Sequence, residues 1–303
     1  MLIGIALRII TQRRKSLKAK TVFCFNLLYL FTIWAILPLV VLVSISRHTA
    51  SELFVFANAF FLAFFSLGVC FVTSVAISRF TSDDRKITIS VVLNSSFQNC
   101  TFLGFPIIYA LLGADGLGPA TIYAIGISVP HLIFGVILAS NVAKKRITAG
   151  LVLHNIITFP AAFALIVAIL FVTLSAFLPS LIRDTFDVYL ADLFFALMLL
   201  LVGFRMPIVS PMKYLKTLTT VSIMRFIVGP LVTISAILLL GLNIKTDITP
   251  KPALIMAIMP PGMLNLVLAL RYKLDLKMYG TLIFYPTLIS LFIMLPVLFL
   301  LIF

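Results

Sequence analysis

Acidic residues are scarce in this 303-residue chain, which holds nine Asp and Glu against 23 Lys and Arg. No carboxylate is predicted near the middle of an apolar segment, which disfavours a sodium/proton antiporter that works through a central aspartate pair. The motifs of zinc proteases, α/β-hydrolases and phosphate-binding loops are also missing. We therefore expect that the chain is not an enzyme and is not driven by ATP.

Cysteine is rare as well. Cys24, Cys70 and Cys100 all lie in apolar segments, and no C-x-x-C spacing occurs. An odd number of scattered cysteines supports neither a disulfide framework nor a metal site. We therefore expect small packing residues at these positions, with no metal and no cofactor.

Apolar residues dominate what remains. They make up 62% of the chain, and the mean hydropathy is +1.23. A soluble domain of this composition would expose one continuous apolar surface, so we expect an all-α polytopic protein in the lipid bilayer. The net charge of +14 lies mainly in loops. There it indicates membrane topology and contacts with lipid headgroups, and we expect no nucleic acid partner.

Nine segments are long enough to span a bilayer, which takes about 20 apolar residues. They are 22–46, 54–78, 88–113, 117–140, 155–178, 189–206, 217–242, 252–271 and 277–303. A tenth, Met1–Ile10, has half that length, and we expect it to be a first helix that lacks its N-terminal half; a genuine half-length helix is the alternative.

The basic residues alternate between the two sides of these segments. Of the 23 Lys and Arg, 18 are Arg8 and the basic residues of loops 11–21, 79–87, 141–154, 205–216 and 271–277. The opposite loops hold four, and Arg225 lies inside a segment. The positive-inside rule puts the first set in the cytoplasm and the C-terminus outside. We expect the membrane to be a bacterial inner membrane.

The two halves then have opposite orientations, which predicts an inverted repeat of five plus five helices. The first repeat is 1–140, the cytoplasmic linker 141–154 and the second repeat 155–303. The fourth segment of each half is interrupted by proline, glycine and amide side chains, and the two interruptions are expected to cross near the middle of the bilayer. Broken helices survive at that depth only where they are buried or line a cavity.

The two interruptions predict a binding site. Each second half-helix would begin just after its Pro/Gly turn and turn its positive dipole end toward the centre, which suits an anion. Five polar side chains in the six residues 94–99 favour a site over a simple proline kink. The candidate substrate-binding residues are Asn94, Ser95, Gln98, Asn99, Gly104, Pro106, Pro260, Pro261, Gly262 and Asn265.

Two other polar residues lie inside apolar segments. Arg225 is a possible charge partner of the substrate, but it follows Thr217 by only eight residues, so its side chain could equally extend to the cytoplasmic interface. For His131 a packing or hydrogen-bonding role is favoured over a proton relay.

The order and spacing of these motifs resemble the auxin efflux carrier family, in its prokaryotic type. Gln98 to Pro106 followed by Gly113 resembles the family's fourth-helix pattern, and Met259-Pro260 with Asn265 and Arg271-Tyr272 resembles the ninth. Asn26 with Pro38, and Arg225 with Pro230, are similar to the second- and eighth-helix signatures. The chain departs from the family at Gln98, where glycine is usual, and at Pro261-Gly262, where small or hydroxyl residues are usual.

The resemblance implies a scaffold part and a transport part with an X-shaped crossover, and organic anions as substrates. We therefore expect a secondary transporter that moves a small organic anion, such as a mono- or dicarboxylate, by alternating access. A non-transporting membrane receptor or sensor on the same fold, or a cation-coupled symporter of the bile-acid-symporter type, is the alternative. The sequence does not choose between H⁺ and Na⁺ as a coupling ion, and it is compatible with a homodimer.

Overall fold

The computed structural model describes residues 1–13, 15–142, 148, 150, 160–174, 179–186, 191–206 and 209–302. Helices account for nearly all of this part of the chain, and no strand is formed within it. Most of the predicted linker 141–154, with Lys144, Lys145 and Arg146, lies outside the described residues. So do residues 155–159 and 175–178 of the segment predicted at 155–178.

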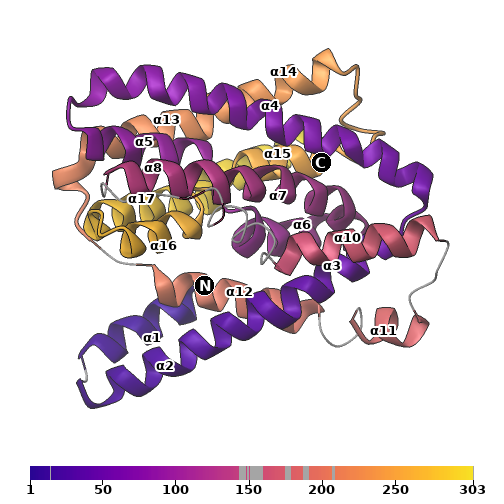
Figure 1. Ribbon diagram of the computed structural model, residues 1–303, viewed down its shortest axis with the longest axis horizontal. Helices are drawn as coiled ribbons and strands as arrows, with labels where there is room; N and C mark the ends of the chain where they lie inside the picture. Colours follow the sequence, from indigo (N-terminus) through magenta and orange to yellow (C-terminus); the bar gives the residue numbers. More distant parts are fainter. Residues whose placement is uncertain are drawn as a thin grey trace.

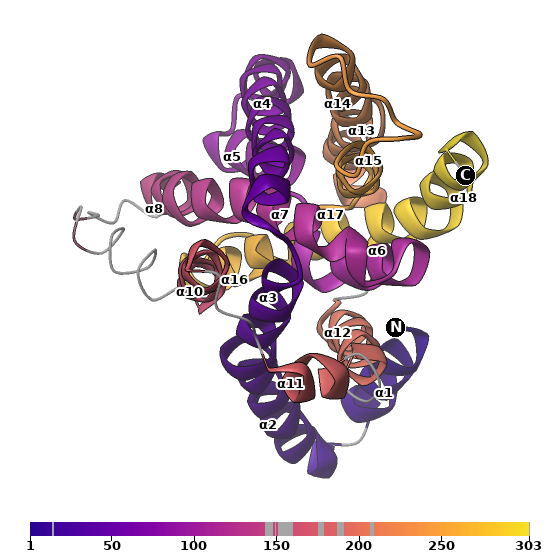
Figure 2. The ribbon, with the colours of Figure 1, turned by 90° about the vertical axis from the view of Figure 1, so that its right-hand side faces the viewer.

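The described helices form two bodies, and Figure 2 shows α1, α2, α11 and α12 of the first body below the rest of the molecule. We call the first the smaller body; its elements are α1 (Leu2–Arg13), α2 (Lys15–Phe31), η1 (Thr32–Ile36), α3 (Leu37–Ser46), α10 (Pro160–Thr173), α11 (Ser180–Thr185) and α12 (Ala191–Arg205). Within it, α1 packs on α12 and α3 packs on α10. These pairs join the start of the chain to its middle.

The remaining elements form the larger body (Figure 1). Its first part comprises α4 (Ala50–Thr81), α5 (Arg85–Ser96), η2 (Cys100–Gly104), α6 (Phe105–Leu112), η3 (Ala114–Gly116), α7 (Leu117–Pro130), η4 (His131–Gly135) and α8 (Val136–Val142). Its second part comprises η6 (Met212–Tyr214), α13 (Leu215–Ile223), η7 (Met224–Val228), α14 (Gly229–Leu239), α15 (Pro250–Ala257), α16 (Met263–Arg271), α17 (Leu276–Ile289), η8 (Ser290–Met294) and α18 (Leu295–Ile302).

Five continuous helices among the described residues are apolar and long enough to cross a membrane. They are Ala19–Ser46, Ala50–Phe80, Ala114–Val142, Met212–Leu239 and Leu276–Ile302. Their outer faces are apolar: Phe54, Phe80 and Leu300 are each at least 84% exposed. Such side chains would form patches in water but are matched to lipid, which agrees with a polytopic membrane protein.

Five of the predicted segments coincide with these helices to within five residues at each end. The first loop differs from its prediction. Residues 11–13 and 15–21, expected as a loop, are helical, because α1 continues to Arg13 and α2 begins at Lys15. Lys, Arg and Ala are good helix formers, so a basic stretch continues a helix readily. The inverted ten-helix repeat stays a prediction.

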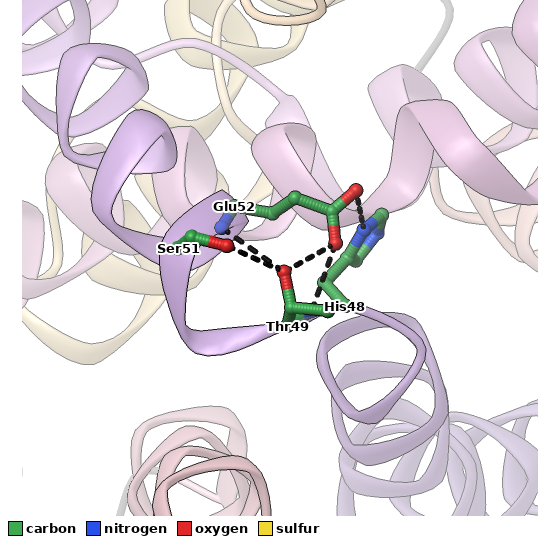
Figure 3. A network of polar contacts seen from close by, with 4 residues as sticks. All are labelled: His48, Thr49, Ser51 and Glu52. Carbon is green, nitrogen blue, oxygen red and sulfur yellow. Dashed lines mark hydrogen bonds and ion pairs between the residues drawn. The ribbon is translucent and has the colours of Figure 1, made fainter.

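A capping box starts α4, the longest helix. Thr49 precedes the helix and its hydroxyl accepts the Glu52 N–H, while the Glu52 carboxylate accepts the Thr49 N–H at 2.8 Å. Figure 3 shows this network together with His48, whose Nδ1 lies 3.7 Å from Glu52. The cap satisfies backbone donors at a helix end and fixes the turn between α3 and α4.

Both predicted interruptions are present. The first half-helix α5 ends at Ser96 and the chain resumes helical structure at Cys100, whereas α15 ends at Ala257 and α16 begins at Met263. The second interruption contains Pro260, Pro261 and Gly262, as expected.

The first interruption differs from its prediction, because the second half-helix begins at Cys100 rather than after Pro106. Gly104 and Pro106 lie inside that half-helix. A π-helical turn, η2, ends two residues before Pro106. A π turn shifts the hydrogen-bonding pattern where proline supplies no N–H, so this proline is built into the helix.

Candidate functional site

The two interruptions pair with each other. Gln98 and Pro261 form an isolated antiparallel bridge, in which the Asn99 N–H donates to the Pro260 carbonyl and the Gly262 N–H donates to the Phe97 carbonyl, both at 2.8 Å. Backbone groups without helical partners are costly in a membrane. Here backbone groups of each broken segment form hydrogen bonds with the other segment. The two segments therefore cross in the interior of the larger body.

Arg225 lies against this crossing and is 1% exposed. Its guanidinium donates five hydrogen bonds of 2.9–3.2 Å to four oxygens. The acceptors are the carbonyls of Ser95, Ala257 and Met259 and the side-chain oxygen of Gln98. An arginine side chain has five N–H donors, and all of them are used. Arg225 therefore binds the ends of α5 and α15 and does not extend to the interface.

Asn265 connects α16 to two other elements, α5 and η4. Its amide nitrogen donates to the Leu93 carbonyl at 3.1 Å and to Asn94 Oδ1 at 3.3 Å. Its oxygen lies 2.7 Å from His131 Nε2. Since the amide nitrogen is already a donor, the oxygen accepts, and His131 carries its proton on Nε2. The His131 ring also stacks on Phe97, with centroids 4.1 Å apart.

Asn99 is only partly satisfied. Its side-chain oxygen accepts the Phe102 N–H at 3.3 Å and so caps the second half-helix. Its side-chain nitrogen is buried and has no hydrogen-bond partner among the described residues, and the same holds for the hydroxyl of Ser95. A buried donor left unpaired costs about 1–3 kcal/mol, so the Asn99 amide is suited to an acceptor from a ligand.

A cavity of about 100 Å³ lies at the crossing. The starts of both second half-helices border it, through Asn99 to Phe102 on one side and Gly262 to Leu264 on the other. Gly262 offers no side-chain cap to α16. Two helix N-termini with positive partial charge and one unpaired amide therefore face the same small space.

A larger cavity of about 470 Å³ adjoins it between the two bodies. Tyr29, Phe102 and Met263 line both cavities. The larger cavity is also lined by Arg8 and Arg205, and its lining includes no Asp or Glu.

Arg205 is oriented by two residues of α2. It donates to Asn26 Oδ1 at 3.0 Å, and its guanidinium carbon lies 3.5 Å from the centre of the Tyr29 ring. The larger cavity thus combines apolar walls with fixed positive charge, as an organic anion requires.

The structure brings most of the predicted site residues together. Gln98, Asn99 and Gly262 line the crossing cavity. Asn94, Ser95, Pro260, Asn265 and Arg225 lie behind it as hydrogen-bonding support, and Pro261 pairs with Gln98 in the bridge. Gly104 and Pro106 do not line it: a Cβ on Gly104 would lie 2.5 Å from Met256 Sδ, and Pro106 borders a separate cavity of about 590 Å³ beside Asp192.

Sequence reasoning missed Tyr29 and Arg205. Asn26 and Tyr29 are three residues apart and share one face of α2, a signal that was available. Arg205 was counted only as a topology charge, because it ends its helix. No group of three His, Cys, Asp or Glu side chains that could hold a metal ion occurs in the described part of the chain.

Comparisons with known proteins agree with this architecture. A family model described as a membrane transport protein matches residues 136–298, more than half of the chain. An uncharacterized transporter of Methanocaldococcus jannaschii is 28% identical over 71% of this chain and 68% of its own length. An uncharacterized transporter of Methanothermobacter thermautotrophicus is 26% identical over 69% of this chain and 66% of its own length. The chain therefore belongs to the membrane transport protein family, that of the auxin efflux carriers.

Proposed function

We propose that this chain is a secondary carrier that moves a small organic anion, such as a mono- or dicarboxylate, by alternating access. The observation that carries the proposal is the buried, unpaired Asn99 amide beside the starts of two half-helices. A carboxylate would accept from this amide and from the backbone N–H groups of both helix ends.

The charges around the cavities support an anion over a cation. Arg8 and Arg205 line the approach, and neither cavity lining includes a carboxylate. A cation entering through the larger cavity would meet two fixed positive charges and two positive helix ends before it reached the crossing. This favours the anion carrier over a cation-binding site of the bile-acid-symporter type.

The arrangement of the two bodies supports alternating access. The cavities lie between the smaller and the larger body, so a relative movement of the bodies would open or close them around the crossing. A receptor on this fold would bind the same anion without releasing it on the other side. Transport itself therefore distinguishes the two functions.

The test is uptake of labelled acetate, malonate, malate and citrate by proteoliposomes that contain the purified chain. We expect saturable uptake of at least one of them. Asn99→Ala removes a hydrogen bond to a charged group, worth about 1.5–3 kcal/mol, so affinity should fall by roughly 10- to 100-fold. Asn58→Ala on α4, away from both cavities, is the control and should behave as the parent.

Two results would contradict the proposal. Parental affinity and rate in Asn99→Ala would remove Asn99 from the site. Saturable binding of a carboxylate without uptake would favour the receptor.

A further inference from the structure

Arg225 contacts both interrupted helices at once. Ser95 lies in the last turn of α5, and Ala257 is the last residue of α15. The carbonyls of both residues, with that of Met259, accept from its guanidinium. The fourth oxygen comes from Gln98, whose amide nitrogen is held by the Tyr123 hydroxyl at 2.9 Å.

The charges balance without a carboxylate. A helix C-terminus carries about half a negative elementary charge, so the two ends together present about one. The single positive charge of Arg225 matches that sum. Among the described residues, no Asp or Glu forms an ion pair with Arg225.

Oxygens in this arrangement are what a coupling ion requires. In carriers with interrupted helices, unwound backbone carbonyls and half-helix C-terminal ends coordinate Na⁺ near the middle of the membrane. Here the carbonyl oxygens at the ends of α5 and α15 accept hydrogen bonds from the Arg225 side chain instead. Arginine stays protonated in proteins, so its charge is permanent.

We propose that Arg225 is a resident cation that takes the place of a coupling sodium ion at the crossing. The chain then needs no Na⁺ to hold its broken helices together, and its transport is independent of a Na⁺ gradient. Gln98 contributes directly, because its side chain supplies one of the four oxygens. The transport part of this inference rests on the proposed function, whereas the structural part does not.

The structural part is tested by thermal unfolding of the purified chain, followed with a thiol-reactive dye. Cys70 and Cys100 are buried and become reactive on unfolding, and Cys24→Ser removes the exposed thiol. We expect the same Tm in sodium chloride, lithium chloride and choline chloride at equal ionic strength. A Tm higher by several degrees in Na⁺ or Li⁺ would overturn the proposal.

Arg225→Ala provides the second measurement. It leaves four oxygens around a space shaped for a guanidinium, so Tm should fall and ethylguanidinium should restore part of the loss. Choline at the same concentration should not restore it. Arg271→Ala, at an exposed position, is the matched control, and ethylguanidinium should not raise its Tm. Failure of ethylguanidinium to raise the Tm of Arg225→Ala would contradict a resident cation.

Arg225→Lys covers the case in which the alanine variant does not fold. Lysine keeps the charge but has three donors in place of five, so we expect a measurable Tm below that of the parent, again without a Na⁺ effect. Stabilisation of Arg225→Lys by Na⁺ would overturn the proposal.

Transport adds an independent readout. In proteoliposomes, uptake of the transported carboxylate should be unchanged when choline replaces Na⁺ on both sides, and an inward Na⁺ gradient should not accelerate it. Acceleration by Na⁺ would overturn the inference and leave the carrier function intact. Absence of uptake with any carboxylate would instead contradict the proposed function, while the Tm results would still decide the role of Arg225.

Discussion

Asn99 uses only one end of its side-chain amide inside the protein. The oxygen caps the second half-helix by accepting from Phe102, and the nitrogen has no partner. The two ends can be separated experimentally, because aspartate keeps the cap oxygen and replaces the donor with a second acceptor. A negative charge at a helix N-terminus is itself favourable.

We therefore expect Asn99→Asp to fold at least as stably as Asn99→Ala and to transport less. The added carboxylate would repel an anion from the crossing cavity, and no donor would remain at this position. Thermal unfolding and carboxylate uptake measured on both variants check this prediction. Full uptake by Asn99→Asp would show that Asn99 acts only as a cap.

Arg225 shows what residue-level reasoning could not decide. Counted from Thr217, it was eight residues into its helix and within reach of the interface. The helix begins at Met212, so at 1.5 Å per residue Arg225 lies about 20 Å along it. The helix start depends on residues 212–216, which combine polar and apolar side chains and give no clear hydropathy boundary.

At the scale of elements, the apolar segments and both interruptions were predictable from the sequence, but the local backbone structure around the prolines was not. Long apolar runs and charged loops locate helices, and clustered amides in an apolar run indicate a break. Pro106 was wrongly predicted to lie in the break. Pro38, Pro106, Pro230 and Pro296 all follow a π-helical turn by two residues, so the four share one local structure.

The first break therefore needs no proline. It is held open by pairing with residues 260–262, a contact across more than 150 residues that no local pattern contains. The clustered amides located the break at Gln98 and Asn99. The pairing that holds it open could not be predicted, and Pro106 was therefore assigned to the break.

The contact between α1 and α12 gives an element-scale prediction. A Cβ on Gly203 would overlap the Met1 carbonyl and lie 3.1 Å from the Ile5 nitrogen, and one on Gly4 would overlap the Leu200 carbonyl. Small residues allow such close helix packing in membranes. We expect Gly203→Ala to destabilise the protein by about 1–3 kcal/mol, because the neighbouring atoms are backbone and cannot rotate away.

Gly68→Ala is the matched control within α4. Nothing lies within 4 Å of a Cβ added there. Alanine is favoured over glycine in a helix by about 0.5–1 kcal/mol, so this variant should be as stable as the parent or more stable. Thermal unfolding compares the two. Equal stability of both variants would contradict the close α1–α12 contact.

At the scale of the whole molecule, two cavities lie at opposite ends of α12, one lined by Asp192 and Phe195 near its start and the other by Phe204 and Arg205 at its end. The larger body contributes Val267 to the 470 Å³ cavity. Arg8 and Arg205, which are predicted to lie on the cytoplasmic side, also line this cavity. It contributes Ala110 to the 590 Å³ cavity, near the turn at Gly113. That turn carries no Lys or Arg, as expected of an outer loop.

These two positions test sidedness and access together. In a Cys24→Ser background, we expect Ala110→Cys to react with a membrane-impermeant maleimide in right-side-out vesicles. Val267→Cys should react in inside-out vesicles, because its cavity is bordered by residues that the positive-inside rule assigns to the cytoplasm. A transported carboxylate should slow labelling of Val267→Cys, since it would occupy the path to Asn99. Labelling of Val267→Cys from the outside would reverse the topology, whereas labelling insensitive to the carboxylate would separate this cavity from the transport path.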